Sequence, residues 1–210
     1  MTGDFNSALR IVTIGAWLLL LAQYAGIAMR AELRLPLALL ALANIAAMLA
    51  GGGLLFAPSM AEPFILLLAA FAPFAAWLAV LRLIGQGPEW RTVLVAALAV
   101  AGTFAVARYG GPPGEPAFYA LRVLSLLLAA DIARAAIVGR SRDREPARRA
   151  LRLTLAPFAA LQAGLPVLAE MVVGRGFLPA PLSLAEAALT LVLAMLLALA
   201  LFVPERALLD

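Results

Sequence analysis

Long apolar segments, broken only by short runs of Gly, Pro and Arg, constrain this chain more than any other feature. A helix needs about 20 predominantly apolar residues to cross the hydrocarbon core of a bilayer. Such segments fold as helices, because a bilayer leaves no water to satisfy free backbone groups. The sequence predicts an all-α bundle of seven transmembrane helices, which forms one transmembrane domain over residues 1–210. The expected spans lie at about 8–29, 35–56, 63–84, 92–107, 116–138, 150–173 and 182–203.

The composition and the positions of the helix-breaking prolines agree with this interpretation. Hydrophobic residues make up 65% of the chain, far above the usual share in a soluble domain. Pro73 is expected to break the third span, and Pro157 and Pro166 are expected to kink the sixth. The first ten residues lack the charge pattern of a signal peptide, so we expect an uncleaved first span.

An arginine-rich segment at 139–152 sets the expected orientation. It lies between two apolar segments, and a cationic loop in that position marks the cytoplasmic side. Seven alternating spans then place the N-terminus outside and the C-terminus in the cytoplasm. We expect the protein to lie in the bacterial inner membrane. With this orientation, only Arg10, Arg108 and Arg175 fall on the outer side, and Arg122 lies within a span. The cytoplasmic basic loop comprises Arg140, Arg142, Arg144, Arg148, Arg149 and Arg152.

The basic loop has two readings that the sequence leaves open. It can act only as the determinant of topology, or it can also bind anionic lipid head groups or an acidic partner. Pro146 suits the first turn of a helix, so the sixth helix is expected to start near Ala147. Arg148, Arg149 and Arg152 would then lie on its first turns, and Arg140, Arg142, Arg144, Arg148 and Arg149 are expected at the inner membrane surface.

Missing residue types exclude several kinds of chemistry. All sixteen basic residues are Arg, and without Lys there is no Schiff base. The chain has no His and no Cys, which excludes ordinary haem ligation, iron–sulfur clusters and zinc sites. Motifs for a metalloprotease, a nucleophile elbow or a phosphate loop are also missing from the sequence. We expect a protein that is not an enzyme and that has no catalytic residue, metal site or cofactor.

Charged residues inside the apolar spans predict two clusters, because such residues are costly in a bilayer and are usually paired. Arg122, Glu170 and Glu186 are expected to form an outer cluster, in which Arg122 pairs with Glu170 first and Glu186 second. A separate, inner cluster would comprise Arg82, Asp131 and Arg134. Both clusters can be structural ion pairs that fix the helix register. The outer cluster can instead form a pocket for a small or anionic ligand.

The segment from Asp143 to Arg152 reads D-R-E-P-A-R-R-A-L-R, and the helix after it ends in G-L-P-V-L-A-E at Glu170. These residues resemble the end of the membrane module in membrane-anchored AraC-type transcription regulators. The resemblance covers mainly 131–170, and it implies a seven-span module with a cytoplasmic C-terminus. Members of that family continue into a helix-turn-helix domain, whereas this sequence ends at Asp210. DNA binding is therefore not carried over, and no direct contact with nucleic acid is expected.

Three functions remain open at this stage. The resemblance favours a sensory, signal-transducing membrane module. An accessory or scaffolding subunit of a larger membrane complex is the alternative, with the lipid bilayer and other membrane subunits as partners. A small transporter or channel is the third reading, although the middle of the spans holds few of the acidic groups that an ion path requires.

Overall fold

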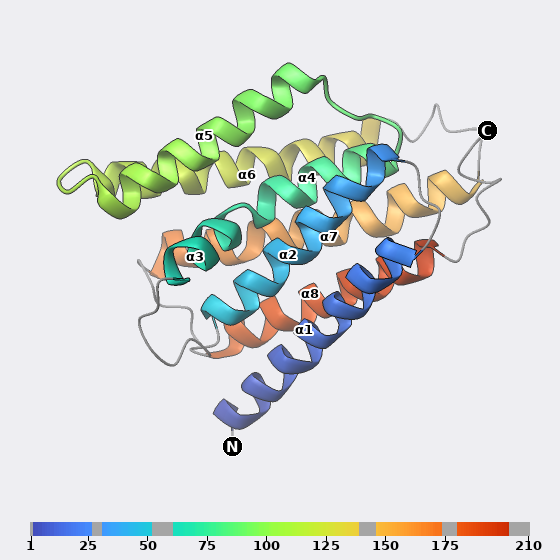
Figure 1. The fold of residues 1–210 in the computed structure, drawn as a ribbon, viewed down its shortest axis with the longest axis horizontal. Helices are drawn as coiled ribbons and strands as arrows, with labels where there is room; N and C mark the ends of the chain where they lie inside the picture. The colour runs from blue at the N-terminus through green and yellow to red at the C-terminus, as the bar shows by residue number, and fades with distance from the viewer. Residues whose placement is uncertain (1, 27–30, 52–60, 139–145, 174–179, 202–210) are drawn as a thin grey trace.

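The computed structural model describes residues 2–26, 31–51, 61–138, 146–173 and 180–201. All regular structure in these residues is helical, which confirms the all-α part of the prediction. Figure 1 shows the helices as a bundle in which elements distant in sequence lie side by side. They are α1 (Thr2–Gly26), α2 (Ala31–Gly51), α3 (Glu62–Ala70), α4 (Ala72–Leu83), α5 (Trp90–Tyr109), α6 (Gly114–Val138), α7 (Pro146–Val173) and α8 (Ala180–Leu201).

Most of these helices have the length and apolarity of membrane spans. Five of them qualify separately, namely α1, α2, α5, α7 and α8, and the total is six if α3 and α4 together form one bent span. The sequence predicts seven spans, and the helix that makes the difference is α6. It has 25 residues, but it carries Glu115, Arg122, Asp131 and Arg134.

Pro73 explains the bend between α3 and α4. The two helices meet at Phe71 with an angle of 45°, two residues before this proline. Proline has no N–H to donate to the carbonyl four residues earlier, and its ring crowds that carbonyl. The backbone accommodates Pro73 in the first turn of a new helix, where an N–H has no intrahelical partner in any case. The predicted break in the third span is therefore confirmed.

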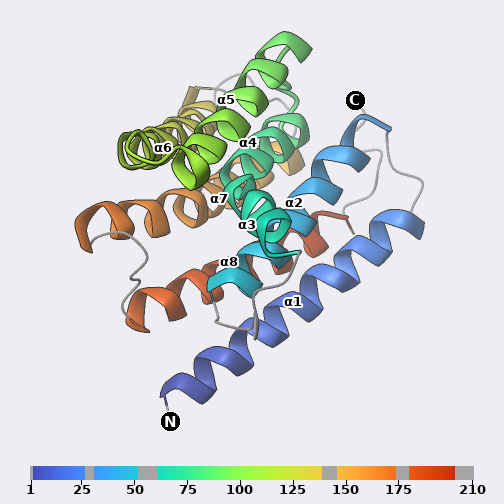
Figure 2. The same cartoon turned by 60° about the vertical axis from the view of Figure 1, so that its left-hand side comes forward.

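Helix α4 is the centre of the bundle. Ala72 and all residues from Phe74 to Leu81 are buried, because α2, α6 and α7 all pack against this short helix. Most other contacts join helices that follow each other in the chain. In addition, α8 packs along α1 at the far side of the bundle (Figures 1 and 2). Helix α5 lies at the opposite edge and packs mainly on α6, with Val100 as its only buried residue.

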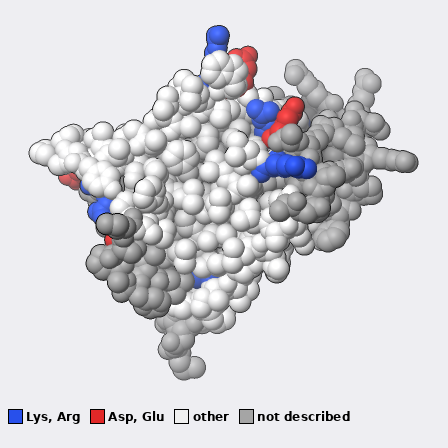
Figure 3. Space-filling model, viewed as in Figure 1, with Lys and Arg blue, Asp and Glu red and all other residues white. Residues whose placement is uncertain are grey.

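Charged side chains gather near the ends of the helices. Figure 3 shows one face of the molecule, on which the broad middle is almost entirely without Lys, Arg, Asp or Glu. A broad surface without charged side chains is typical of a protein that faces hydrocarbon rather than water. The face therefore agrees with the membrane character of the helices.

Arg152 joins three helices near the start of α7. Its side chain is only 3% exposed, and it donates from Nη1 to the Ala135 carbonyl and from Nη2 to the Ile84 carbonyl, both at 3.1 Å. Both acceptors lie at helix C-termini, of α6 and α4, where the last carbonyls lack intrahelical donors and carry partial negative charge. The prediction that Arg152 belongs to the surface of a basic loop is wrong, because these carbonyls hold it inside the bundle.

The remaining predictions for the basic loop have separate outcomes. Helix α7 begins at Pro146, so Arg148, Arg149 and Arg152 do lie on its first turns, as predicted. The side chain of Arg149 is exposed. The side chain of Arg148 lies outside the described part of the structure, as do all atoms of Arg140, Arg142 and Arg144.

Replacing Arg152 by Met tests this connection. The substitution keeps the apolar stem but leaves two buried carbonyls without their donor, so we expect the free energy of unfolding to fall by about 1–3 kcal/mol. Arg149→Met is the matched control, because Arg149 lies on the same helix and is exposed. It should change stability by no more than about 0.5 kcal/mol. Unfolding of the purified protein in detergent measures both, and equal effects of the two variants would contradict the assignment.

Candidate functional site

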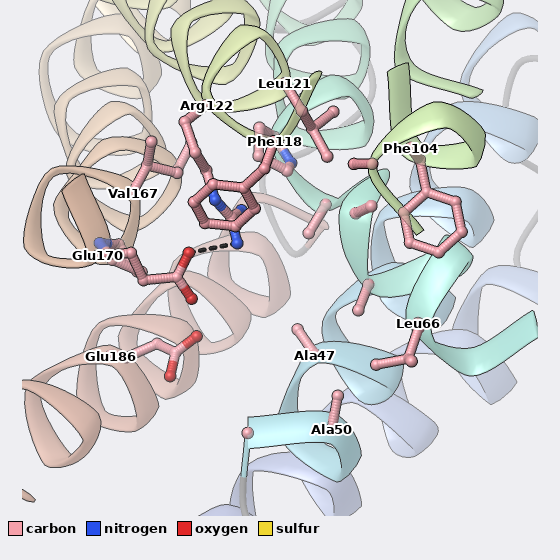
Figure 4. A pocket seen from close by; sticks show the side chains of 18 of the residues that line it. Ala47, Ala50, Leu66, Phe104, Phe118, Leu121, Arg122, Val167, Glu170 and Glu186 are labelled. Carbon is pink, nitrogen blue, oxygen red and sulfur yellow. Dashed lines mark ion pairs between the residues drawn. The ribbon is translucent and has the colours of Figure 1, made fainter. Parts of the chain in front are cut away.

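Arg122 and Glu170 form an ion pair between α6 and α7. Both side chains are about four-fifths buried, and the Arg122 guanidinium also lies 4.9 Å from the centre of the Phe118 ring, one turn earlier on α6. Figure 4 shows the pair with this ring beside it. The predicted pairing is therefore confirmed, and it follows from the positions of the two residues along their helices. Arg122 lies near the start of one helix and Glu170 near the end of the next, so antiparallel packing brings them together.

Glu186 has a different partner from the one that the sequence predicts. Its Oε2 atom lies 2.9 Å from Nη2 of Arg10, and the ion pair joins α8 to α1. Arg10 is 1% exposed, although the sequence suggests only that it lies at the outer side. The signal that could have found it is its position, because Arg10 falls inside the predicted first span at 8–29 rather than before it. A buried arginine there requires a carboxylate, and α8 supplies one.

The end of α2 shapes the space around Arg10. The Arg10 guanidinium donates to the Met48 carbonyl at 3.3 Å and to the Ser183 hydroxyl at 2.9 Å. Gly51 is the last residue of α2, and a Cβ atom there would lie 2.8 Å from Nη1 of Arg10. The missing side chain of Gly51 thus allows the guanidinium to lie directly against the helix end.

The two ion pairs border one cavity of about 670 Å³. This volume is within the range of small-molecule sites in proteins. In Figure 4, the carboxylates of Glu170 and Glu186 and the guanidinium of Arg122 point toward a common space. All eight helices contribute to its wall, with side chains that include Arg10, Ala47, Leu66, Ala72, Phe104, Phe118, Gln162 and Ser183.

A buried amide pair adjoins the cavity through Gln162, which lies in the cavity wall. Gln162 of α7 donates from Nε2 to Oδ1 of Asn44 on α2 at 2.9 Å, and Asn44 donates in turn to the Leu40 carbonyl at 2.9 Å. This chain of donors fixes the orientation of both amides. It leaves Oε1 of Gln162 buried and without a hydrogen-bond partner among the described residues. An unsatisfied acceptor at the wall of a cavity is a place where a ligand or a water can donate.

A third ion pair lies at the rim. Arg108, at the end of α5, lies 3.4 Å from Glu62 at the start of α3, and both side chains are partly exposed. Exposed pairs of this kind contribute little to stability. The rim pair does show that α3 and α5 approach each other at the same end of the bundle as the two buried pairs.

The predicted inner cluster forms only in part. Asp131 pairs with Arg134, three residues later on α6, at 2.8 Å. Asp131 also accepts a hydrogen bond from Nε1 of Trp77 at 2.9 Å, a contact that the sequence did not suggest. The inclusion of Arg82 is wrong, because its guanidinium turns toward Glu32 at 3.8 Å and the Pro88 carbonyl at 3.4 Å. This cluster lines no part of the cavity, so we treat it as structural.

Comparisons of the sequence with protein-family models and with curated proteins, and of the fold with solved structures, found no match. We therefore infer the function from the geometry of the cavity. Its charged groups are held by ion pairs from different helices, and an unused acceptor lies in its wall. Such an arrangement can bind and orient a polar molecule in a pocket that is partly open at the surface of the bundle.

Replacing Arg122 tests the cost of breaking a pair in this site. Arg122→Met leaves Glu170 buried without its ion-pair partner, and we expect a loss of stability of about 3 kcal/mol, near the lower end for buried pairs because a fifth of each side chain is exposed. The double variant R122M/E170L should recover to within about 1 kcal/mol of the original protein. The control is Arg108→Met at the rim, which should cost less than about 1 kcal/mol. Unfolding in detergent is the measurement, and a double variant as unstable as the single one would contradict the pairing.

Proposed function

We propose that this chain is a ligand-sensing membrane module, in which the cavity binds a small molecule from the outer side and the bundle transmits the binding to the cytoplasmic side. The observation that carries the proposal is the cavity itself. Ion pairs that serve only to fix helix register need no space beside them, whereas here about 670 Å³ adjoins both pairs. Concave pockets of this size that are lined by apolar side chains and a few fixed polar groups are typical ligand sites.

The participation of all eight helices supports transmission of a signal. A ligand in the cavity touches the wall that every helix helps to build, so its binding favours any rearrangement that improves these contacts. Helix α7 extends from Glu170 at the cavity to Arg149 and Arg152 near its start. Because Arg152 binds the ends of α4 and α6, a shift of α7 at the cavity changes contacts at the other end. This role agrees with what the resemblance at 131–170 implies.

The proposal includes seven spans, an outer cavity and a cytoplasmic basic loop in the inner membrane of a bacterium. Helix α6 counts as a span because it reaches from one end of the bundle to the other. Arg122 meets Glu170 near the end of α7, and the Ala135 carbonyl meets Arg152 near its start. Arg122, Asp131 and Arg134 have partners within the bundle, which lowers the cost of placing them in a bilayer.

Helix α5 supports the assignment to a membrane. Leu94, Val95 and Leu98 are exposed along it, and the exposed Trp90 and Tyr109 lie at its two ends. Aromatic residues gather at membrane–water interfaces on either side of an apolar stretch. The pattern is typical of a helix that faces lipid.

A screen of small molecules against the purified protein in detergent tests the proposed function. A ligand of the cavity raises the melting temperature, because it binds the folded state only. We expect at least one class of polar small molecule to do so in the original protein and not in R122M/E170L. The matched control is Arg134→Met, which breaks an exposed ion pair on α6 outside the cavity and should keep the ligand response. If no compound acts through the buried pair, the sensing role is wrong.

Reporter fusions test the proposed topology. A fusion at Gly111, between α5 and α6, should report the outer side, and a fusion after Asp210 should report the cytoplasm, because α6, α7 and α8 each cross once. A fusion within the basic loop should report the cytoplasm as well. Identical results at Gly111 and in the basic loop would mean that α6 does not cross the membrane.

A further inference from the structure

The charges around the cavity are balanced before any ligand enters. Among the residues that the structure describes, every charged side chain in the wall has an opposite partner, and three arginines are matched by three glutamates. The pairs are Arg10–Glu186, Arg122–Glu170 and, at the rim, Arg108–Glu62. A simple anion that bound an arginine in place of its glutamate would leave a buried carboxylate unpaired. A simple cation that bound a glutamate in place of its arginine would leave a guanidinium unpaired. Either loss is severe in a low-dielectric site.

A zwitterion avoids both losses. Its carboxylate can accept from the guanidinium groups while its ammonium group donates to the glutamates, so the alternation of charge continues through the ligand. The protein groups have capacity for this, since a guanidinium carries five donors and a carboxylate accepts about four hydrogen bonds. The Nε atom of Arg10 is buried and has no hydrogen-bond partner among the described residues. It is therefore a donor available to a ligand carboxylate.

The shape of the cavity adds a second requirement. Gln162 and Glu170 are eight residues apart on α7, which corresponds to about 12 Å along the helix. Between them the wall of α7 is apolar, with Ala163, Pro166 and Val167. Other helices add Leu66, Phe104 and Leu121 to the cavity wall, shown in part in Figure 4. A ligand that starts at the ion pairs and extends inward thus meets apolar side chains first and the free Oε1 of Gln162 last.

We infer that the cavity binds a free α-amino acid whose large, mainly apolar side chain ends in a hydrogen-bond donor. The carboxylate lies at Arg10 and Arg122, the ammonium group lies at Glu170 and Glu186, and the tip of the side chain donates to Oε1 of Gln162. Tryptophan and tyrosine have this combination of groups. The inference deepens the proposed function by naming the class of its ligand, and it rests on that function.

A matched series of compounds tests each of the three contacts on the unmodified protein. L-Tryptophan provides all of them, tryptamine lacks the carboxylate, indole-3-propionate lacks the ammonium group, and L-phenylalanine lacks the donor at the tip. Calorimetric titration in detergent should show the tightest binding for L-tryptophan. We expect L-phenylalanine to bind about tenfold more weakly, because Gln162 then stays unsatisfied. Tryptamine and indole-3-propionate should each bind at least about thirtyfold more weakly, because each leaves a buried charge without its partner.

The variants locate the binding. R122M/E170L should abolish binding of L-tryptophan, while Arg134→Met, which breaks an exposed ion pair on the same helix away from the cavity, should keep it. Indole-3-propionate or tryptamine binding as tightly as L-tryptophan would overturn the zwitterion, and equal binding of L-phenylalanine would overturn the role of Gln162. If no member of the series binds, the amino-acid class is wrong, and the proposed function survives only if another compound class acts through the buried pair. Binding of L-tryptophan that persists in R122M/E170L would place its site elsewhere and overturn the inference.

Discussion

The cost of an unpaired charge in an apolar interior governs this structure. Arg10 and Arg122 are both largely removed from water, and each reaches a glutamate on another helix. These pairs join α1 to α8 and α6 to α7, which are also the helix neighbours with extensive packing. Since most of the remaining surface between the helices is apolar and nondirectional, the charged groups define which helices must meet and at which depth. The two ion pairs therefore fix the end of the bundle at which the cavity lies.

The cavity exists because charge and side-chain size act together. Alanine and glycine occupy much of its wall, including Ala47, Ala50, Ala163 and Gly51, and such residues cannot fill the volume between helices. In a bundle held only by apolar packing, the helices would close over such a void. Here the ion pairs, and the bond from Gln162 to Asn44, keep α1, α2, α6, α7 and α8 at their separations. The same groups that hold the space open are those that a polar ligand would contact.

The sequence correctly predicts the features that depend on local chemistry or on the depth of a residue along one helix. The helical class, the break at Pro73 and the start of α7 at Pro146 follow from apolar length and from the missing N–H of proline. The pair between Arg122 and Glu170 follows from their depths on consecutive helices. Reasoning failed for Glu186, Arg82 and Arg152, whose partners are Arg10, Glu32 and two carbonyls. The spacing of residues along the chain does not reveal which helices are neighbours. It also does not reveal which backbone carbonyls are left without a donor.

The sequence by itself determined that this chain forms apolar helices, where most of them begin and end, and which buried charges required partners. It did so because helix formation in an apolar stretch is a local consequence of backbone hydrogen bonding and hydropathy. Only the tertiary structure decided that α8 returns to α1, that Arg10 is buried against Glu186, and that Gln162 presents a free acceptor to a cavity. These features depend on which helix faces pack together. Many faces in a chain so rich in Ala and Leu are nearly equivalent, so the ion pairs and hydrogen bonds between buried polar groups on different helices select one arrangement.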